Sequence, residues 1–439
     1  MTDNNQPNHH WKTLDRDLGR IAALESATSY VSKPMVGLGI SLVFVVVASL
    51  IATLLFGEEN TRWIVVLAAA VGAYMALNIG ANDVANNMGP AVGAKALTMG
   101  GAILIAAIFE SAGALLAGGD VVSTISKGIV SPESVSGPGI FIWAMMAALL
   151  SSALWINLAT WVGAPVSTTH SIVGGVMGAG IAAAGFGAVN WPTMGSIAAS
   201  WVISPILGGV IAAAFLAFIK KFIIYQDDKI AAARRWVPVL VAIMAGAFAS
   251  YLSLKGLSKL VKIEMGNALL IGLGVAVLSY FLSAPVIKRK SIGLENRNRS
   301  LKVLFGLPLV ISAALLSFAH GANDVANAVG PLAAIVHAAE TGGEFAGKVH
   351  IPLWVMVIGA FGISVGLVLF GPKLIRMVGS QITKLNPMRA FVSTYRDLLY
   401  DANAPSLIRL GVMLLSAILS LSIGWFVFNR MGRRLPEEV

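Results

Sequence analysis

The sequence predicts an all-α polytopic membrane protein with an inverted-topology repeat, broken helices and at least one re-entrant helical hairpin. Of its 439 residues, 57% are hydrophobic and 12% are charged, about half the charged fraction of a soluble domain. Apolar runs of about 20 residues, the length that crosses a bilayer, recur along the chain. One polar stretch occurs twice, as GANDVANNMGP at 80–90 and as GANDVANAVGP at 321–331.

Composition also argues against several other classes of protein. The chain has no cysteine, so it offers neither a disulfide nor a thiolate metal site. Its net charge of +10 comes from Lys and Arg in the links between apolar runs, where they orient membrane helices, so we expect no nucleic-acid partner. Residues 1–35 are polar and lack the apolar core of a signal peptide, which predicts a cytoplasmic N-terminal tail.

The apolar runs divide the chain into segments. Membrane helices are predicted at 36–56, 63–81, 99–117, 193–218, 236–254, 265–287, 304–320, 352–372 and 407–429. Three more apolar stretches are Gly-rich, short or interrupted: 139–164, 171–189 and 325–338. We expect an additional N-terminal helix at 36–56, a first repeat at 60–218, linker helices with basic loops at 219–303, an incomplete second repeat at 304–391 and an atypical C-terminal segment with one helix at 392–439.

The distribution of positive charge predicts the orientation of these helices. Lys and Arg gather in 1–35, 219–235 and 288–302, which we place in the cytoplasm, whereas the acidic link 57–62 faces outward. The helix that leads into Gly80 then runs inward, and the helix that leads into Gly321 runs outward. Two similar sequences that enter the membrane from opposite faces form an inverted repeat, which in secondary transporters places the substrate and the coupling ion near the midplane.

Each copy of the repeated stretch carries an Asn-Asp pair, Asn82-Asp83 and Asn323-Asp324. Carboxylate and amide oxygens are ligands that a hard cation such as sodium prefers. The flanking glycines and prolines predict breaks in the helices, which would add free backbone carbonyls. The alternative is that the small residues serve packing and each Asp pairs with a buried lysine. Because the pair occurs twice, the functional interpretation is favoured.

The stretch PVSTTH at 165–170 lies between the apolar stretches 139–164 and 171–189. Proline followed by hydroxyl side chains is typical of a helix N-terminus, whose free N–H groups and positive dipole end attract anions. We therefore predict a re-entrant hairpin at 139–189 with an anion site at its tip. An ordinary turn outside the membrane, with a Ser/Thr cap, is the alternative.

Other polar residues leave more than one role open. Glu110 lies inside an apolar helix and needs a proton or a partner, so it is a coupling-ion ligand, a proton carrier or the partner of Lys95 or Lys127. His320 could add a proton-dependent step, although a hydrogen-bonded structural role weighs more. Ser167 and His170 would suit a nucleophile and its base, but no activated geometry is evident, so we expect no enzyme.

These residues resemble the PiT family of inorganic phosphate transporters. The resemblance rests on the two GANDVAN stretches, on IFESAGALLAGGDVVSTISKGIV after the first of them, and on WINLATWVGAPVSTTHSIVGGVMG, and it covers residues 60–391. It implies phosphate import driven by sodium or protons through a dimeric inverted-repeat fold with two re-entrant hairpins. We expect the chain in the inner (plasma) membrane, as a homodimer, with no cofactor beyond the coupling ion.

The resemblance also implies roles for individual residues. It implies phosphate binding by Ser167, Thr168, Thr169, Asp83 and Asp324. It implies coupling-ion roles for Asn82, Asp83, Asn86, Glu110, Asn323, Asp324 and Asn327, with sodium held at Asn82, Asp83, Asn323 and Asp324.

The C-terminal end departs from the family pattern, because LNPMRAF at 385–391 is followed by Val392-Ser393-Thr394 and not by a second PVSTTH. A non-transporting remnant that lacks the second hairpin is therefore one alternative. A permease for sulfate or another tetrahedral oxyanion is the other. Hydrogen phosphate can donate a hydrogen bond to an aspartate and sulfate at neutral pH cannot, which favours phosphate.

Overall fold

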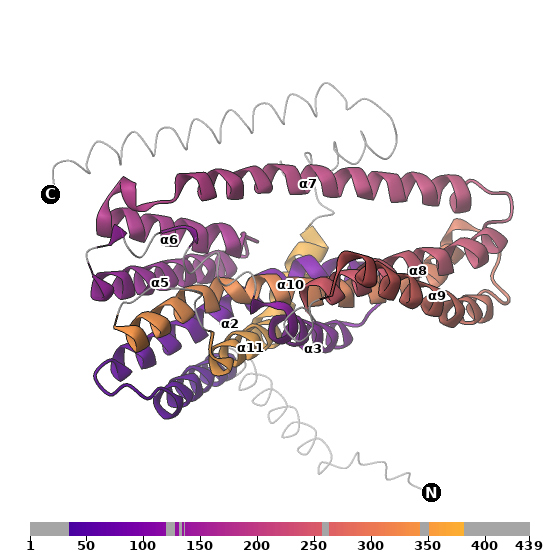
Figure 1. The fold of residues 1–439 in the computed structure, drawn as a ribbon. Helices are drawn as coiled ribbons and strands as arrows, with labels where there is room; N and C mark the ends of the chain where they lie inside the picture. Colours follow the sequence, from indigo (N-terminus) through magenta and orange to yellow (C-terminus); the bar gives the residue numbers. More distant parts are fainter. Residues whose placement is uncertain are drawn as a thin grey trace, which may run out of the picture. The chain divides into compact units, whose positions relative to one another are not determined.

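The computed structural model describes residues 35–119, 128–130, 134–135, 137–256, 263–342 and 351–381, almost entirely as helices (Figure 1). Within these residues, nine helices are long and apolar enough to cross a membrane, so the polytopic membrane fold is confirmed. The N-terminal tail, the C-terminal segment and the helix predicted at 407–429 lie outside the described residues.

The first helix is Met35–Leu55. The helices that follow are α2 Arg62–Gly93, α3 Met99–Ala117, α5 Pro138–Val162, α6 Thr168–Ala184, α7 Trp191–Ile219, α8 Lys229–Lys255, α9 Met265–Lys290, α10 Asn298–Thr341 and α11 Leu353–Gln381. Two short elements are the 3₁₀ turn η3 Phe186–Ala188 and the π turn η4 Lys220–Ile224, which extends α7.

Both copies of the repeated stretch lie inside unbroken helices. α2 continues through 80–90, and α10 continues through 321–331. The helix breaks predicted at these glycines and prolines are therefore wrong. The glycines serve close helix packing instead, because a Cβ on Gly80 would collide with the Ile363 carbonyl of α11. The chain does break at 163–167, between α5 and α6, where Gly163 adopts a φ of 80°.

The chain divides into two compact units. The first comprises the described residues of Met1–Asp83, Ala106–Asn190 and Phe318–Pro372. In this unit, each repeat packs its second helix against the first helix of the other repeat. Gly113 of α3 lies against the Phe318 carbonyl of α10, and Gly366 of α11 lies against the Leu77 carbonyl of α2. Leu77 and Phe318 hold the same position of the repeat, so the two contacts are related by an internal two-fold symmetry.

Two contacts show that α2 and α10 run antiparallel. Thr61, directly before α2, donates to the Ala339 carbonyl near the end of α10. Further along α2, Gly72 faces Leu332. Residue numbers thus rise along α2 while they fall along α10, as the inversion predicted from loop charges requires.

α5 and α6 form a helical hairpin within the same unit. Gly175 of α6 lets the helices approach, because a Cβ there would meet the Ser152 hydroxyl and the Ala148 carbonyl at 2.5 and 2.9 Å. The Ser152 hydroxyl donates to the Ser171 carbonyl at 3.0 Å. The hairpin predicted at 139–189 is therefore present, and its re-entrant depth stays a prediction.

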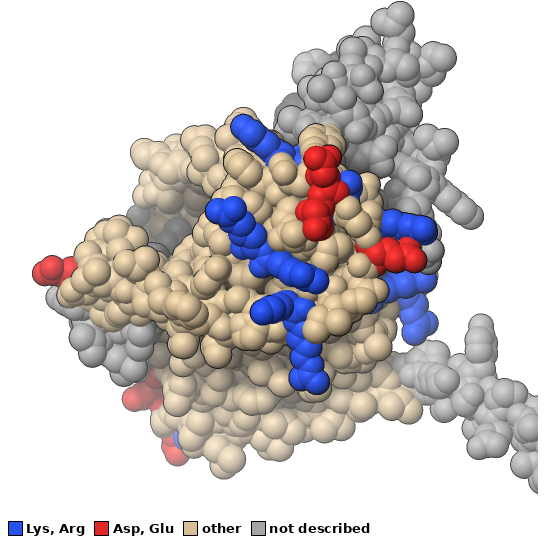
Figure 2. Space-filling view, turned by 90° about the vertical axis from the view of Figure 1, so that its right-hand side faces the viewer, with Lys and Arg blue, Asp and Glu red and all other residues tan. Residues whose placement is uncertain are grey.

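The second unit comprises the described residues of Val84–Ile105, Trp191–Ser317 and Lys373–Val439. Its α8 and α9 approach closely because Gly246 of α8 lies against the backbone of Gly272. At one end, the basic loops 219–235 and 288–302 meet. The Asn296 side chain accepts from the Lys229 amide at 2.9 Å and donates to the Asp227 carbonyl at 2.6 Å. Both loops therefore lie on one face, where Figure 2 shows a spread of Lys and Arg side chains. This common face agrees with the topology predicted from charge.

Candidate functional site

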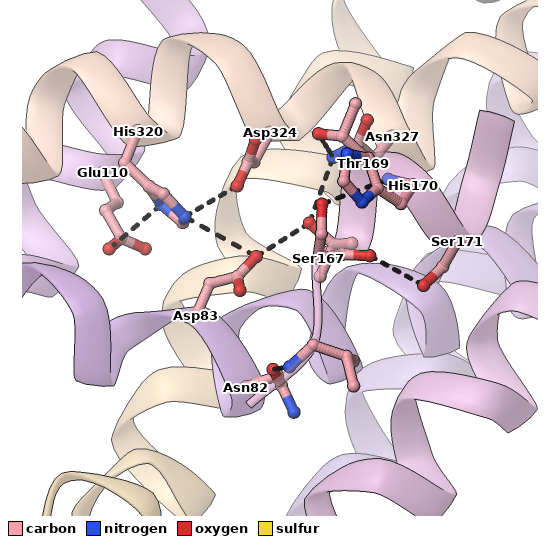
Figure 3. Close-up of polar contacts among 12 residues, drawn as sticks. Asn82, Asp83, Glu110, Ser167, Thr169, His170, Ser171, His320, Asp324 and Asn327 are labelled. Atoms are coloured by element: carbon pink, nitrogen blue, oxygen red, sulfur yellow. Dashed lines mark hydrogen bonds and ion pairs between the residues drawn. The ribbon is translucent and has the colours of Figure 1, made fainter. Parts of the chain in front are cut away.

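The aspartates of the two repeated stretches face the same ring nitrogen of a histidine in the first unit. Asp83 comes from α2 and Asp324 from the equivalent position of α10. The His320 Nε2 atom lies 2.7 Å from the Asp324 carboxylate and 3.7 Å from the Asp83 carboxylate (Figure 3). Both aspartates are buried, with exposed fractions of 4% and 7%. The fold thus brings residues 241 positions apart in the sequence to one point.

Glu110 of α3 joins the same group. Its Oε1 atom lies 3.5 Å from the His320 Nδ1 atom, and its side chain is buried. Gly321 makes this approach possible, because its missing Cβ leaves room for the backbone of Glu110. The structure therefore gives Glu110 a histidine partner in place of the lysines considered from sequence, and Lys127 lies outside the described residues.

The charge balance of this cluster favours a cation. Three carboxylates surround one imidazole, so even a protonated His320 leaves an excess of negative charge in a buried place. Buried carboxylates need a proton, a metal ion or a positive partner. Ligand atoms of Asp83, His320 and Asp324 all lie within 4.8 Å of one another, which is close enough for one ion to contact them together.

The tip of the α5–α6 hairpin reaches this cluster. The Thr168 hydroxyl donates to the Asp83 carboxylate at 2.7 Å. The Asn327 amide of α10 donates to the Thr168 and Thr169 hydroxyls at 3.2 and 3.1 Å. Ser167 caps α6 by accepting from the His170 amide. The N-terminus of α6, which is the positive end of its dipole, therefore lies next to Asp83.

Asn82 holds the hairpin tip against α2. Its amide nitrogen donates to the Thr160 hydroxyl at 2.9 Å and to the Ala164 carbonyl at 3.2 Å. Its amide oxygen accepts from the Val166 backbone at 3.0 Å. The side chain thus positions the tip, and its predicted contact with a coupling ion stays a prediction.

The asparagines of the two copies of the repeat differ in burial and in their contacts. Asn82 and Asn327 are buried and bonded to the hairpin, whereas their repeat equivalents, Asn323 and Asn86, are exposed. Ser167 is exposed as well. The roles predicted for Asn323, Asn86 and Ser167 in binding the coupling ion or phosphate stay predictions.

The sequence alone favours a structural role for His320, whereas the structure places its ring against three carboxylates. Its signal was present, because a histidine four residues before Asp324 shares its helix face. The sequence could not show that α3 would bring Glu110 to the other ring nitrogen.

Comparison with known proteins shows the family to which the chain belongs. Residues 79–397 match the model of the phosphate transporter family. The chain belongs to the phosphate transporter family. A relative from Helicobacter pylori strain J99, named as a phosphate permease, is 51% identical over 378 residues, which cover 85% of this chain and 71% of the relative. A Haemophilus influenzae relative with the same name is 37% identical over 77% of this chain and 82% of its own length.

A solved structure named as the sodium-dependent phosphate transporter shares the fold of this family member. Its TM-score is 0.69 at 32% identity, and the match covers 81% of this chain and 94% of the solved chain. The family resemblance predicted from the sequence is thus confirmed. This member is a multi-pass membrane transporter and not an enzyme.

Proposed function

We propose that this transporter imports inorganic phosphate by symport with a cation. The observation that carries the proposal is the hydrogen bond from Thr168 to Asp83, which joins a helix N-terminus suited to an anion to a carboxylate suited to a cation. Opposite charges bound at adjacent places stabilise each other, so each ion raises the affinity for the other.

Sodium is the coupling ion that we propose first. Asp83 and Asp324 supply the oxygen ligands that a hard cation prefers, and the solved relative is named as sodium-dependent. Sodium at Asp83 would draw the carboxylate away from Thr168 and leave that hydroxyl available to phosphate. A proton is the alternative coupling ion, with His320 as its carrier, because the imidazole contacts all three carboxylates.

Phosphate would bind at the start of α6. Thr168 and Thr169 offer hydroxyls there, Ser167 closes the first turn, and the first backbone N–H groups of a helix have no partner within the helix. Hydrogen phosphate can donate to Asp83 or Asp324 while it accepts from these groups, which supports phosphate over sulfate. We further propose a homodimer in the inner (plasma) membrane with a cytoplasmic N-terminus, on the basis of family resemblance and loop charge.

The test is uptake of labelled phosphate by proteoliposomes that contain the full chain. A sodium gradient, a proton gradient and no gradient are compared, with and without excess sulfate. We expect uptake that requires sodium and resists sulfate. If sulfate competed equally, the substrate would be tetrahedral oxyanions in general and not phosphate. If a proton gradient alone drove uptake, the coupling ion would be the proton and not sodium.

The non-transporting alternative is tested in the same vesicles. A chain without uptake under any gradient, but with sodium-dependent phosphate binding, would be a remnant that keeps its binding site. Insertion of a PVSTTH hairpin after Phe391 would then restore uptake.

A further inference from the structure

The second unit contains a large cavity that shares no lining residue with the Asp83–Asp324 cluster. Its volume is about 1120 Å³, and α7, α8 and α10 supply most of its lining. Pockets for small molecules are typically about 300–1,000 Å³. The cavity is therefore large for a phosphate ion.

One end of the cavity is basic. Lys95 follows the end of α2, Lys290 ends α9, and Lys302 lies in the second turn of α10, and all three line the cavity. Among the described residues that line it, none is acidic. Lys290 and Lys302 belong to the basic loops that meet on the face shown in Figure 2. A negatively charged group would be held here without competition from a carboxylate.

Apart from Ser312, the rest of the lining is apolar, and it follows the helices away from the lysines. On α8 the lining residues are Leu240, Ile243, Met244 and Ala247, a spacing that places them on one helix face. On α10 the lining runs from Lys302 to Ser312, a rise of about 15 Å at 1.5 Å per residue. That length is about half of a 30 Å hydrocarbon core. The cavity thus has a cationic end beside the basic loops and an apolar extension along α8 and α10.

We propose that this cavity binds an anionic phospholipid. The three lysines hold the phosphate of the headgroup, and the acyl chains lie along the apolar faces of α8 and α10. Basic pockets between membrane helices on the cytoplasmic side are suited to anionic headgroups. Free phosphate matches only the basic end, because the apolar walls would give its charge no hydrogen bonds.

The full chain, purified in detergent, is titrated with phosphatidylglycerol or phosphatidylcholine, and bound lipid is counted by native mass spectrometry. The wild type retains phosphatidylglycerol in preference to phosphatidylcholine. Lys95→Gln, Lys290→Gln and Lys302→Gln combined lower the affinity for phosphatidylglycerol about 100-fold, at roughly five-fold for each lysine near the surface. The control removes three cations of the same loops that do not line the cavity: Lys220→Gln, Lys221→Gln and Arg297→Gln.

A second pair of variants leaves charge unchanged. A Cβ on Gly306, which lines the cavity, meets nothing within 4 Å, so Gly306→Leu is tolerated by the helix and fills the acyl space. Gly208→Leu on α7 is its control, because Gly208 also has open space and does not line the cavity. We expect at least a ten-fold loss of phosphatidylglycerol affinity for Gly306→Leu alone.

Four results would overturn the proposal. These are equal binding of both lipids, equal losses in the triple variant and its control, displacement of phosphatidylglycerol by inorganic phosphate, or conversion of a dimer to a monomer by Gly306→Leu. The last result would show that a second copy of the chain occupies the cavity. None of these measurements depends on transport, so they are independent of the proposed function.

Discussion

The Thr168 hydroxyl donates a 2.7 Å hydrogen bond to the Asp83 carboxylate, and both side chains are buried. Thr168 is the first residue of α6, so the bond joins the hairpin tip to an aspartate of the repeated stretch. Asn327 donates to the same hydroxyl from the other copy of the repeat. Binding of a cation or a proton at the Asp83 carboxylate would therefore act directly on the N-terminus of α6, where we propose that the anion binds.

Replacement of Thr168 by valine removes this bond with little change of shape. The Asp83 carboxylate then loses a donor, at a cost of about 1–3 kcal/mol, and the proposed phosphate ligand loses a hydroxyl. We expect the KM for phosphate to rise about 10- to 100-fold. Thr168→Ser keeps the hydroxyl and should stay within a few-fold of wild type. Equal KM values for the two variants would exclude the hydroxyl from phosphate binding.

Asp83→Asn and Asp324→Asn each remove one of the two symmetry-related charges while they preserve size. If both carboxylates hold the coupling ion, each variant should reduce sodium-driven uptake at least about 100-fold, since a buried ion loses a charged ligand. Initial uptake rates in proteoliposomes at several sodium concentrations measure this. Unchanged uptake by Asp83→Asn would remove that residue from coupling.

The sequence predicted the membrane helices because apolar length is a local property, and it predicted the inversion because loop charge records orientation. The helix breaks that it predicted at the glycines of the repeat were wrong. Gly80 and Gly321 look like helix breakers in the sequence, yet each lies where another helix backbone comes into contact. That use depends on a partner far away in the chain, Ile363 for Gly80 and Glu110 for Gly321, and no local pattern contains it.

The sequence likewise predicted which residues form the candidate site, but not all of their contacts. The hydroxyls of the hairpin and the aspartates of both copies were identified by residue type. The role of Asn82 was not, because its amide bonds the backbone of Ala164 and Val166 only after the hairpin folds over α2. The histidine contact of Glu110 likewise depends on α3 packing against α10.

Alanine at Gly113 or Gly366 should destabilise the crossing of the two repeats. A Cβ at either position would press on the carbonyl of Phe318 or Leu77, and overpacking of this kind costs about 1–3 kcal/mol. Gly174→Ala on α6 is the matched control, because a Cβ there meets nothing within 4 Å and alanine favours the helix. Thermal unfolding in detergent should give lower midpoints for the first two variants and an equal or higher midpoint for the control.

Asn82→Ala should loosen the hairpin tip. The variant removes three hydrogen bonds and leaves the Val166 amide without its partner, which corresponds to about 1–3 kcal/mol. Hydrogen–deuterium exchange of peptides that cover 163–170 should accelerate at least about ten-fold. Asn323→Ala is the repeat-matched control, because Asn323 is exposed, and it should leave exchange at the hairpin unchanged. Similar acceleration in both variants would show that the tip is not held by Asn82.

His320→Gln tests whether the cluster binds sodium. Loss of the imidazole leaves the buried carboxylates of Asp83, Asp324 and Glu110 without their shared partner, which destabilises the sodium-free protein. Sodium would then replace the missing positive charge, and an ion that binds only the folded state raises its stability. We expect a larger sodium-induced rise in melting temperature for His320→Gln than for His337→Gln, a change at another buried histidine of α10. Equal rises in the two variants would place sodium elsewhere and leave the proton as the coupling ion at this cluster.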